Sequence, residues 1–306
     1  MKLFLRLLFL FSYLSFLLFF FLPSSEPVTF SFWSCQEINC SAVLISLLET
    51  YPDHACAFYD LRNSEVTSSI REGVIFDEND DGTSALAPVS SKGLMHHKYC
   101  VFSDQLVLTG SWNPTPQGTY DNDNYILLIN SSKISLAYLK EYEYLQTRTG
   151  LVPSVDLTTP SGFVDVFFCP LHDCQREVIT ALSKATSSVK MLAFTFTDAE
   201  IAEELYLLSQ KGVDVEVIFE KTRITKYSTI HSFSDTAVKT FLDGNPHTMH
   251  EKLIIINNRT VIAGSYNPTK GAAQKNDENL LIITDSSLAL SALEEYQRVR
   301  TQSTPS

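Results

Sequence analysis

The sequence predicts an α/β protein built from two similar halves. Apolar, strand-like runs alternate with helical segments along the chain, as they do in α/β folds. The segments follow the same order in both halves, and one short polar pattern occurs in each half at identical internal spacing. We therefore expect two pseudo-symmetric α/β repeats, residues 26–150 and 151–306, behind an N-terminal segment of residues 1–25.

The N-terminal segment is nearly all apolar from residue 3 to residue 22, and its only charges are Lys2 and Arg6. The uncharged apolar stretch from Leu7 to Leu22 is at the short limit for a membrane span, and no small-x-small cleavage pattern follows it in Pro23 to Pro27. We interpret it as a signal peptide or signal anchor and favour an uncleaved anchor. The positive flank predicts a body on the non-cytoplasmic side, so we expect an exported protein that is membrane-anchored or secreted.

The first half begins with an apolar stretch after Cys40 and ends in a helix. Asn130 is well placed to cap this helix, because its side chain can accept a hydrogen bond from the first helical turn. Between them we expect strands over residues 54–59, 99–102 and 125–129, and a solvated polar loop over residues 77–91.

The second half repeats this order after a joint that we place in the Gly-, Pro-, Ser- and Thr-rich residues 149–162. Its closing helix has Asp285 as the expected cap. The expected segments are an apolar stretch over 178–182, strands over 188–196, 213–219, 253–256 and 279–283, and a helix over 198–211.

Composition limits the possible functions. The 306 residues are 44% hydrophobic, enough for a packed core, and the formal net charge is −12. Non-specific binding to long nucleic acids normally requires a basic stripe, and the sequence has no such run. An acidic surface disfavours a general nuclease, although a small positive cleft can lie within it.

The six cysteines are consistent with export. Cys35 and Cys40 share their spacing with Cys169 and Cys174, which leaves Cys56 and Cys100 over. Sequence alone does not choose among the possible pairings. Because no Cys-x2-Cys pair or paired histidine accompanies them, we favour buried structural cysteines or local bridges over a zinc site.

The repeated polar pattern carries the chemistry. Two cationic residues are followed, after eleven intervening residues, by Gly-Ser-x-Asn, and the copies lie 154 residues apart. Such a pair does not arise by chance. The first copy is His96-His97-Lys98 with Gly110-Ser111-Trp112-Asn113, and the second is His250-Glu251-Lys252 with Gly264-Ser265-Tyr266-Asn267.

Together the two copies suit cleavage of a phosphodiester. Residues two apart on a strand point to one side, so each His and Lys can face one pocket. One of His96 and His250 would attack phosphorus and become a phosphohistidine, while the other would act as acid and then base. Lys98, Lys252, Asn113 and Asn267 would hold the non-bridging oxygens, and no metal or other cofactor is needed because the lysines neutralise the charge.

These residues resemble the HKD motif of the phospholipase D superfamily, H-x-K-x4-D-x6-G-S-x-N, and the resemblance covers residues 30–300. It implies a phospholipase D-like fold, with the active site at the pseudo-twofold interface of two α/β repeats. The family includes phospholipases, cardiolipin synthases and hydrolases, and metal-independent nucleases, so the motif does not fix the substrate. The family tends to use the histidine of the first half as nucleophile, here His96.

Two features depart from or extend the motif. Its Asp position holds Ser103 in the first copy and Asn257 in the second. The family also places an acidic residue after the Gly-Ser-x-Asn turn to orient a histidine, and Asp123 and Glu278 match that place. We expect both carboxylates, with Ser111 and Ser265 of the turns, to support the histidines. His97 should face the opposite side of its strand and be structural.

We thus predict a membrane-tethered, metal-independent phosphodiesterase that hydrolyses phospholipid headgroups. Phospholipid is the expected substrate, and the membrane is the expected partner of the N-terminal segment. One alternative is a metal-independent endonuclease, although the acidic charge disfavours nucleic acid. The other is a degenerate, non-catalytic member that binds anionic lipid or a partner protein.

Overall fold

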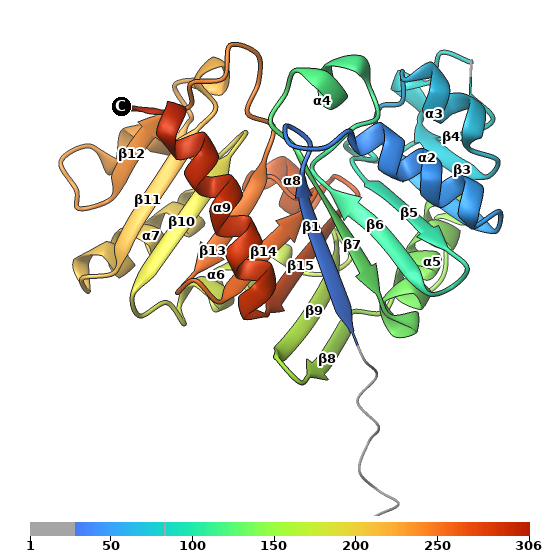
Figure 1. Ribbon diagram of the computed structural model, residues 1–306. Helices are drawn as coiled ribbons and strands as arrows, with labels where there is room; N and C mark the ends of the chain where they lie inside the picture. Colours follow the sequence, from blue (N-terminus) through green and yellow to red (C-terminus); the bar gives the residue numbers. More distant parts are fainter. Residues whose placement is uncertain (1–27, 83) are drawn as a thin grey trace, which may run out of the picture.

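The computed structural model describes residues 28–82 and 84–306 of the chain (Figure 1). The predicted signal peptide or anchor, residues 1–25, lies outside them. Across the described residues, no helix has both the length and the apolar character needed to cross a membrane. They form two β-sheets with helices packed on them, which confirms the α/β prediction.

The first sheet has seven strands in the order β1-β7-β6-β5-β2-β3-β4. β2 lies between an antiparallel neighbour, β5, and a parallel neighbour, β3. The strands are β1 Thr29–Ser34, β2 His54–Phe58, β3 Gly73–Phe76, β4 Ala87–Val89, β5 Lys98–Phe102, β6 Leu106–Gly110 and β7 Tyr125–Asn130.

The second sheet has nine strands in the order β16-β12-β11-β10-β13-β14-β15-β9-β8. Its section from β11 to β9 reproduces the first sheet from β3 to β1, so the two repeats share one topology. The strands are β8 Val155–Thr159, β9 Gly162–Cys169, β10 Ser188–Ala193, β11 Asp214–Phe219, β12 Lys239–Leu242, β13 Lys252–Ile256, β14 Thr260–Gly264, β15 Glu278–Thr284 and β16 Thr304–Pro305.

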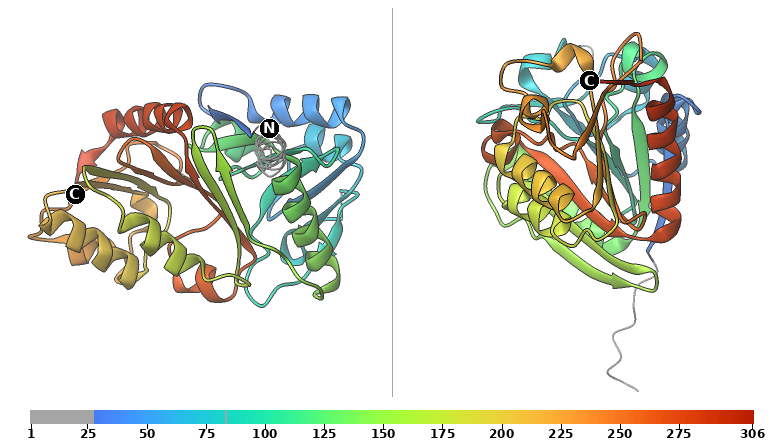
Figure 2. Two further views of the ribbon diagram at one scale, coloured as in Figure 1. Left: turned by 90° about the horizontal axis from the view of Figure 1, so that it is seen from below. Right: turned by 90° about the vertical axis from the view of Figure 1, so that its left-hand side faces the viewer.

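Helices lie on both sides of the paired sheets (Figure 2). The largest apolar core lies between the sheets and includes residues of both repeats, among them Tyr99, Tyr138 and Tyr296. Helix α9 packs against β1 of the other repeat (Figure 1), which joins the two halves into one body. The helices are α2 Cys40–Thr50, α3 Ser64–Ser69, α4 Pro116–Tyr120, α5 Ser132–Thr147, α6 Cys174–Leu182, α7 Ala199–Gln210, α8 Lys270–Gln274 and α9 Ser286–Gln302, with 3₁₀ turns η1 Asp77–Asn79, η2 Lys221–Arg223 and η3 Thr229–Phe233.

Three expectations from sequence differ in detail from the structure. Asn130 is not the cap of α5, because it still belongs to β7, and Ser131 accepts the capping hydrogen bond from Ile134. The polar loop over residues 77–91 contains the short strand β4, and the expected joint over residues 149–162 contains β8. Both short strands pair at the edges of their sheets, where polar sequences are tolerated.

The cysteines form three disulfides, and no described cysteine is free. Cys35–Cys40 and Cys169–Cys174 are local bridges, one of the two arrangements that the sequence favoured over a zinc site. The remaining bridge, Cys56–Cys100, joins residues that lie opposite each other on β2 and β5. Its pairing follows from strand register, which the sequence does not reveal.

The residues at the motif Asp position lie in turns remote from the histidines. Ser103 and Asn257 follow β5 and β13, whereas Lys98 and Lys252 begin these strands, roughly 16 Å away at the usual rise per residue. Both have positive φ, 47° and 54°. Asn257 Oδ1 accepts hydrogen bonds from the backbone N–H groups of Thr186 and Ser187, each 2.9 Å long. The departure from the family motif therefore concerns a turn and not the reacting groups.

Replacing Asn257 with alanine should destabilise the fold by about 1–3 kcal/mol, because two N–H groups lose their acceptor. Asn257→Asp should be nearly neutral, since a carboxylate oxygen accepts the same bonds. Ser103→Ala is the matched control, at an equivalent left-handed position. Urea unfolding of the three variants measures this, and equal losses for Asn257→Ala and Ser103→Ala would refute the role given to the Asn257 side chain.

Candidate active site

The histidines and asparagines of both copies, His96, Asn113, His250 and Asn267, line one cavity of about 580 Å³ between the repeats, whereas the buried Lys98 and Lys252 are not among its lining residues. It lies where β2 and β10 end and β5 and β13 begin. The backbone N–H of His96 donates to Asp277 O, and that of His250 donates to Asp123 O, both at 2.9 Å. Each motif histidine is thus positioned by the backbone of the other repeat.

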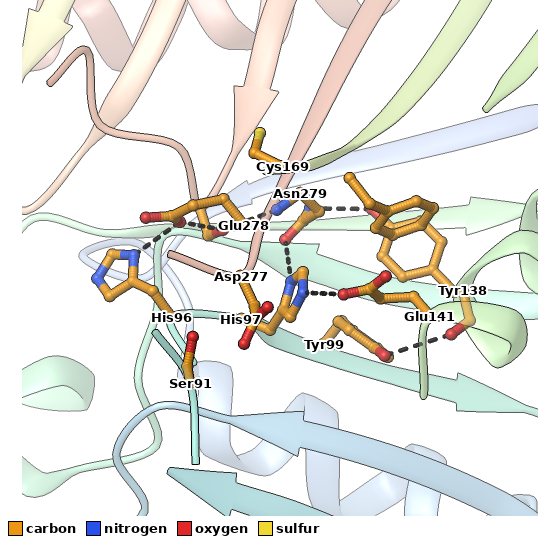
Figure 3. A network of polar contacts seen from close by, with 12 residues as sticks. Ser91, His96, His97, Tyr99, Tyr138, Glu141, Cys169, Asp277, Glu278 and Asn279 are labelled. Carbon is orange, nitrogen blue, oxygen red and sulfur yellow. Dashed lines mark hydrogen bonds and ion pairs between the residues drawn. The ribbon is translucent and has the colours of Figure 1, made fainter. Parts of the chain in front are cut away.

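The first histidine is paired with a carboxylate. His96 Nδ1 donates to Glu278 Oε2 at 2.8 Å, and both side chains are buried (Figure 3). Glu278 Oε2 also accepts from Ser265 Oγ at 2.6 Å. Since a carboxylate accepts only, the proton lies on Nδ1 of His96 and the Nε2 lone pair is free.

The second histidine is paired with an amide. His250 Nδ1 lies 3.0 Å from Asn124 Oδ1, which also accepts from Ser111 Oγ at 3.0 Å. Asn124 Nδ2 donates to Gly118 O, and this bond turns Oδ1 towards the histidine. His250 therefore also carries its proton on Nδ1 and has a free Nε2, but it has no negatively charged partner there.

The prediction that Asp123 orients a histidine is wrong. The carboxylate of Asp123 binds Arg298 at 2.6 Å, and the neighbouring Asn124 takes the place that Glu278 has in the other repeat. Asp277, at the position equivalent to Asp123, forms an ion pair with Arg148 at 2.9 Å. Both pairs join one repeat to the other, so Asp123 and Asp277 stabilise the interface.

The two lysines lie beneath the histidines. Lys98 Nζ donates to His96 O and Lys252 Nζ to His250 O, each at 2.6 Å. Burial lowers the pKa of Lys98 to about 7, despite the opposing effect of Glu278, and it lowers the pKa of Lys252 well below the ordinary value. A phosphate anion in the cavity would raise both pKa values, because it favours the charged forms.

The histidines respond to the same environment. Burial lowers the pKa of His96 to about 4, although Glu278 acts in the opposite direction. Burial, then Lys252 and Lys98, lower the pKa of His250 well below its usual value. Burial would raise the pKa of Glu278, but His96 and Lys98 outweigh it and hold that pKa below the usual range. His96 is thus the histidine with electrostatic support for positive charge.

The Gly-Ser-x-Asn turns bring the asparagines to the cavity. Asn113 and Asn267 line it, and their buried Oδ1 atoms have no hydrogen-bond partner among the described residues. The glycines are required because Gly110 and Gly264 have φ of 147° and 121°. A Cβ at either one would also lie within 2.4 Å of the backbone oxygen of the neighbouring strand.

Sequence reasoning missed two aromatic residues that cover the histidines. Tyr59 lies edge-on to His96 with ring centroids 4.9 Å apart, and Phe194 lies edge-on to His250 at 4.4 Å. Lys98 Nζ is 5.2 Å from the Tyr59 ring and Lys252 Nζ is 4.5 Å from the Phe194 ring. Their signal was an aromatic residue directly after each strand that leads into the site.

In residues 28–82 and 84–306, no group of three or more His, Cys, Asp or Glu side chains is arranged to hold a metal ion. The cavity contains charge of both signs, because Arg62, Arg223 and Asp60 line it together with the two histidines. The arrangement can bind an anion between two imidazoles and offers both Nε2 atoms to it.

The family model for "Cardiolipin synthase, PLD-like domain" matches residues 44–146 and 178–300, more than half of the chain. The chain belongs to the phospholipase D superfamily. Each of the two matched segments contains one His-x-Lys and Gly-Ser-x-Asn pattern, so the match covers both copies.

Relatives with similar sequences match somewhat less than half of this phospholipase D-superfamily protein, whereas a solved structure matches most of its fold. "Phospholipase D" of Rickettsia conorii is 32% identical over 44% of this chain and 67% of its own length. "Mitochondrial cardiolipin hydrolase" of Homo sapiens is 32% identical over 42% of this chain and 51% of its own. The phosphatidylserine synthase structure from Haemophilus influenzae has a TM-score of 0.71 at 12% identity, covering 90% of this chain and 87% of that one, which shows the shared fold.

The two repeats of this phospholipase D-superfamily protein differ at the residue between the motif histidine and lysine, which is His97 in the first and Glu251 in the second. His97, which is fully buried, bonds Glu141 at 2.9 Å, as expected of a structural residue (Figure 3). Glu251 replaces it in the second copy, and Glu295 lies beside it. The Glu251 oxygens are buried, and the Glu295 carboxyl is their hydrogen-bonding partner among the described residues, which requires a proton between the two carboxyl groups. Burial, then Glu295, raise the pKa of Glu251 well above its usual value.

Glu251 should make this protein less stable as the pH rises. A carboxyl group whose folded pKa is raised stabilises the fold fully below its unfolded pKa, and this contribution is lost as the pH rises through the folded pKa. Asp123, Glu295, Arg298 and Lys252 are the charges around it. Once ionised, Glu251 is a buried acceptor without a donor, which costs about 1–3 kcal/mol or more.

Glu251→Gln should therefore unfold at higher urea concentration than the wild type at pH 9, with a much smaller difference at pH 5. Glu203→Gln removes an exposed carboxylate and is the control, for which we expect little change at either pH. Identical pH dependence in Glu251→Gln and the wild type would show that Glu251 does not titrate in this way.

Proposed function

We propose that the protein is a metal-independent phosphodiesterase of phospholipase D type, which hydrolyses phospholipid headgroups through a phosphohistidine. The observation that carries this proposal is the pair of histidines at one cavity. In each histidine the Nδ1–H group donates a hydrogen bond to a residue of the other repeat, Glu278 or Asn124, and Nε2 has no such partner among the described residues. The family and its phospholipase and cardiolipin-hydrolase relatives support the substrate class.

Binding of the substrate phosphate favours the charged form of His250, whose Nε2 takes up a proton from solvent before the reaction. In the first step His96 Nε2 attacks phosphorus in line. The nitrogen lone pair forms the P–N bond, the bond from phosphorus to the headgroup oxygen breaks, and that oxygen takes the proton from His250 Nε2. We assign His96 as nucleophile because phosphorylation gives its ring a positive charge, which the Glu278 carboxylate stabilises. His250 gives up its proton readily, because burial and both lysines disfavour its charged form.

In the second step His250 Nε2 removes a proton from water, and the water oxygen attacks phosphorus. The P–N bond breaks and its electron pair returns to His96. The products are a phosphomonoester and an alcohol. Lys98, Lys252, Asn113 and Asn267 hold the non-bridging oxygens as charge develops on them.

The proposed location is outside the cytoplasm, tethered or secreted through residues 1–25. Three disulfides among the described residues support an oxidising compartment. Protease treatment of intact cells tests this location. Digestion of the body without lysis agrees with it, and full protection would contradict it.

The activity is tested with the full chain and mixed phospholipid vesicles that carry labelled headgroups, in EDTA. We expect headgroup release by the wild type and loss of at least about 10³-fold in His96→Ala and in His250→Ala. Release that needs an added divalent metal would contradict the metal-independent mechanism. Cleavage of single-stranded DNA without headgroup release would favour a nuclease instead.

A further inference from the structure

The two sides of the cavity carry different charge. The first-repeat wall, formed by Tyr59, Asp60 and Arg62, is nearly neutral, because Arg62 binds both oxygens of Asp60 at 2.8 and 2.5 Å. The second-repeat wall, formed by Phe194, Thr195 and Arg223, contains no carboxylate. Arg223 lies over the Phe194 ring at 4.8 Å, and no carboxylate of the described residues forms an ion pair with it.

The residue of the first repeat that corresponds to Arg223 is not cationic, so the unpaired positive charge belongs to the second repeat alone. Phe58 pairs with Lys98 and Ile75, and Ala193 pairs with Lys252 and Phe219. Four residues beyond Ile75 and Phe219 are Asn79 and Arg223, so these two occupy corresponding places. Asn79 donates to Tyr59 O of its own repeat at 2.7 Å, whereas Arg223 is exposed at the cavity.

The loops next to the two walls differ in charge in the same direction. Residues 77–81 behind the first-repeat wall are Asp-Glu-Asn-Asp-Asp, whereas residues 221–226 behind the second are Lys-Thr-Arg-Ile-Thr-Lys. Lys221 is already engaged, since its Nζ donates to Asn245 O at 2.5 Å. Arg223 is therefore the cation of the second-repeat wall that remains available to a ligand.

The mechanism places the leaving alcohol on the Arg223 side. With His96 as nucleophile, in-line geometry sends the leaving oxygen towards His250, whose ring packs against Phe194 at 4.4 Å. Arg223 lies over that same Phe194 ring. A group attached to the leaving oxygen thus meets a guanidinium, which suits phosphate and carboxylate and repels a quaternary or primary ammonium.

We propose, resting on the proposed function, that Arg223 forms a second anion subsite and selects phospholipids whose leaving alcohol carries its own phosphate. Phospholipids with a second phosphodiester on the leaving glycerol have this chemistry. A polynucleotide fits less well, because it carries phosphates on both sides of the scissile bond and would bring one of them to the acidic loop of residues 77–81.

The experiment uses the full chain with one vesicle composition that contains cardiolipin, phosphatidylglycerol and phosphatidylcholine together, so that all three compete at the same surface. The readout is the ratio of kcat/KM values from initial cleavage rates. We expect cardiolipin to be preferred over phosphatidylglycerol, and phosphatidylcholine to be the poorest substrate. Arg223→Gln should lower the ratio of cardiolipin to phosphatidylglycerol about tenfold, since one exposed charge-assisted contact is worth about that factor.

Lys226→Gln is the matched control. It removes the same charge three residues away, from a side chain that lies over Tyr227 and does not line the cavity, so the ratio should not change. Arg223→Glu should shift preference towards phosphatidylcholine. An unchanged ratio in Arg223→Gln, or an equal fall in Lys226→Gln, would overturn the subsite while leaving phospholipid hydrolysis in place. Cleavage of single-stranded DNA with no lipid cleaved would overturn both proposals.

Discussion

Glu278→Gln is expected to lower kcat/KM for phospholipid by about 10²- to 10³-fold. Glutamine can still accept the hydrogen bond from His96 Nδ1, as Asn124 does for His250, so the tautomer is kept. What is lost is the negative charge that stabilises the phosphorylated imidazolium. The defect should therefore appear in the formation of the covalent intermediate.

The leaving group shows which step is affected. With bis(p-nitrophenyl) phosphate, departure of the leaving oxygen needs no general acid, so a defect in the acid would be masked. If His96 is the nucleophile, Glu278→Gln stays defective with this substrate, while substitutions of Asn124 become mild. The opposite pattern would assign His250 as nucleophile.

The pH profile gives an independent measure. Glu278 raises the pKa of His96 and so opposes the effect of burial, which brings that pKa to about 4. Removing the charge lowers the pKa further, and the acidic limb of kcat/KM, which reports deprotonation of the nucleophile, should move to lower pH. A limb that moves to higher pH would show that another group controls it.

The parts of the site that could be predicted are those set by local spacing. Each set lies at the open end of one strand pair: β5 and β13 begin at the lysine, two residues after the histidine, and β6 and β14 end at the glycine, three residues before the asparagine. A strand alternates its side chains, and a tight turn returns the chain beside its start, so short separations in sequence become contacts in space. The duplicated pattern then indicated that both sets serve one site.

The partners of the histidines depended on register between the repeats. Asp123-Asn124 and Asp277-Glu278 both offered an acid before a strand, and a shift of one residue moves a side chain to the other face. The sequence does not show that Gly110 pairs with Ile126 and Gly264 with Leu280, which makes Asn124 and Glu278 equivalent. The same limit hid the Cys56–Cys100 bridge and the correspondence of Asn79 with Arg223.

Each repeat is incomplete without the other, which explains why the pattern occurs twice. Glu278 of the second repeat orients His96 of the first, and Asn124 of the first orients His250 of the second. The partners are not identical, a carboxylate and an amide. A duplicated fold thereby acquired two unequal histidines, which is what an acid–base pair with separate roles requires.

His250→Ala should trap the covalent intermediate when the substrate is bis(p-nitrophenyl) phosphate. The first step proceeds because p-nitrophenolate leaves without a proton, but the second step lacks the base that activates water. We expect a rapid burst of about one p-nitrophenolate per chain followed by turnover slowed by at least about 10³-fold, which is the kinetic sign of an accumulated covalent enzyme.

The residue that carries the trapped phosphoryl group can be identified by mass spectrometry. Intact mass should show the addition of one nitrophenylphosphoryl group, and peptide analysis should place it on His96, with the acid lability of a phosphoramidate bond. His96→Ala should give neither burst nor adduct, because it lacks the atom that attacks phosphorus. An adduct on His250 in the His96→Ala variant would reverse the two roles, and with them the direction in which the leaving alcohol meets Arg223. The position of this covalent bond therefore tests two assignments at once: the role of Glu278 beside the nucleophile and the placement of the leaving alcohol on the Arg223 side of the cavity.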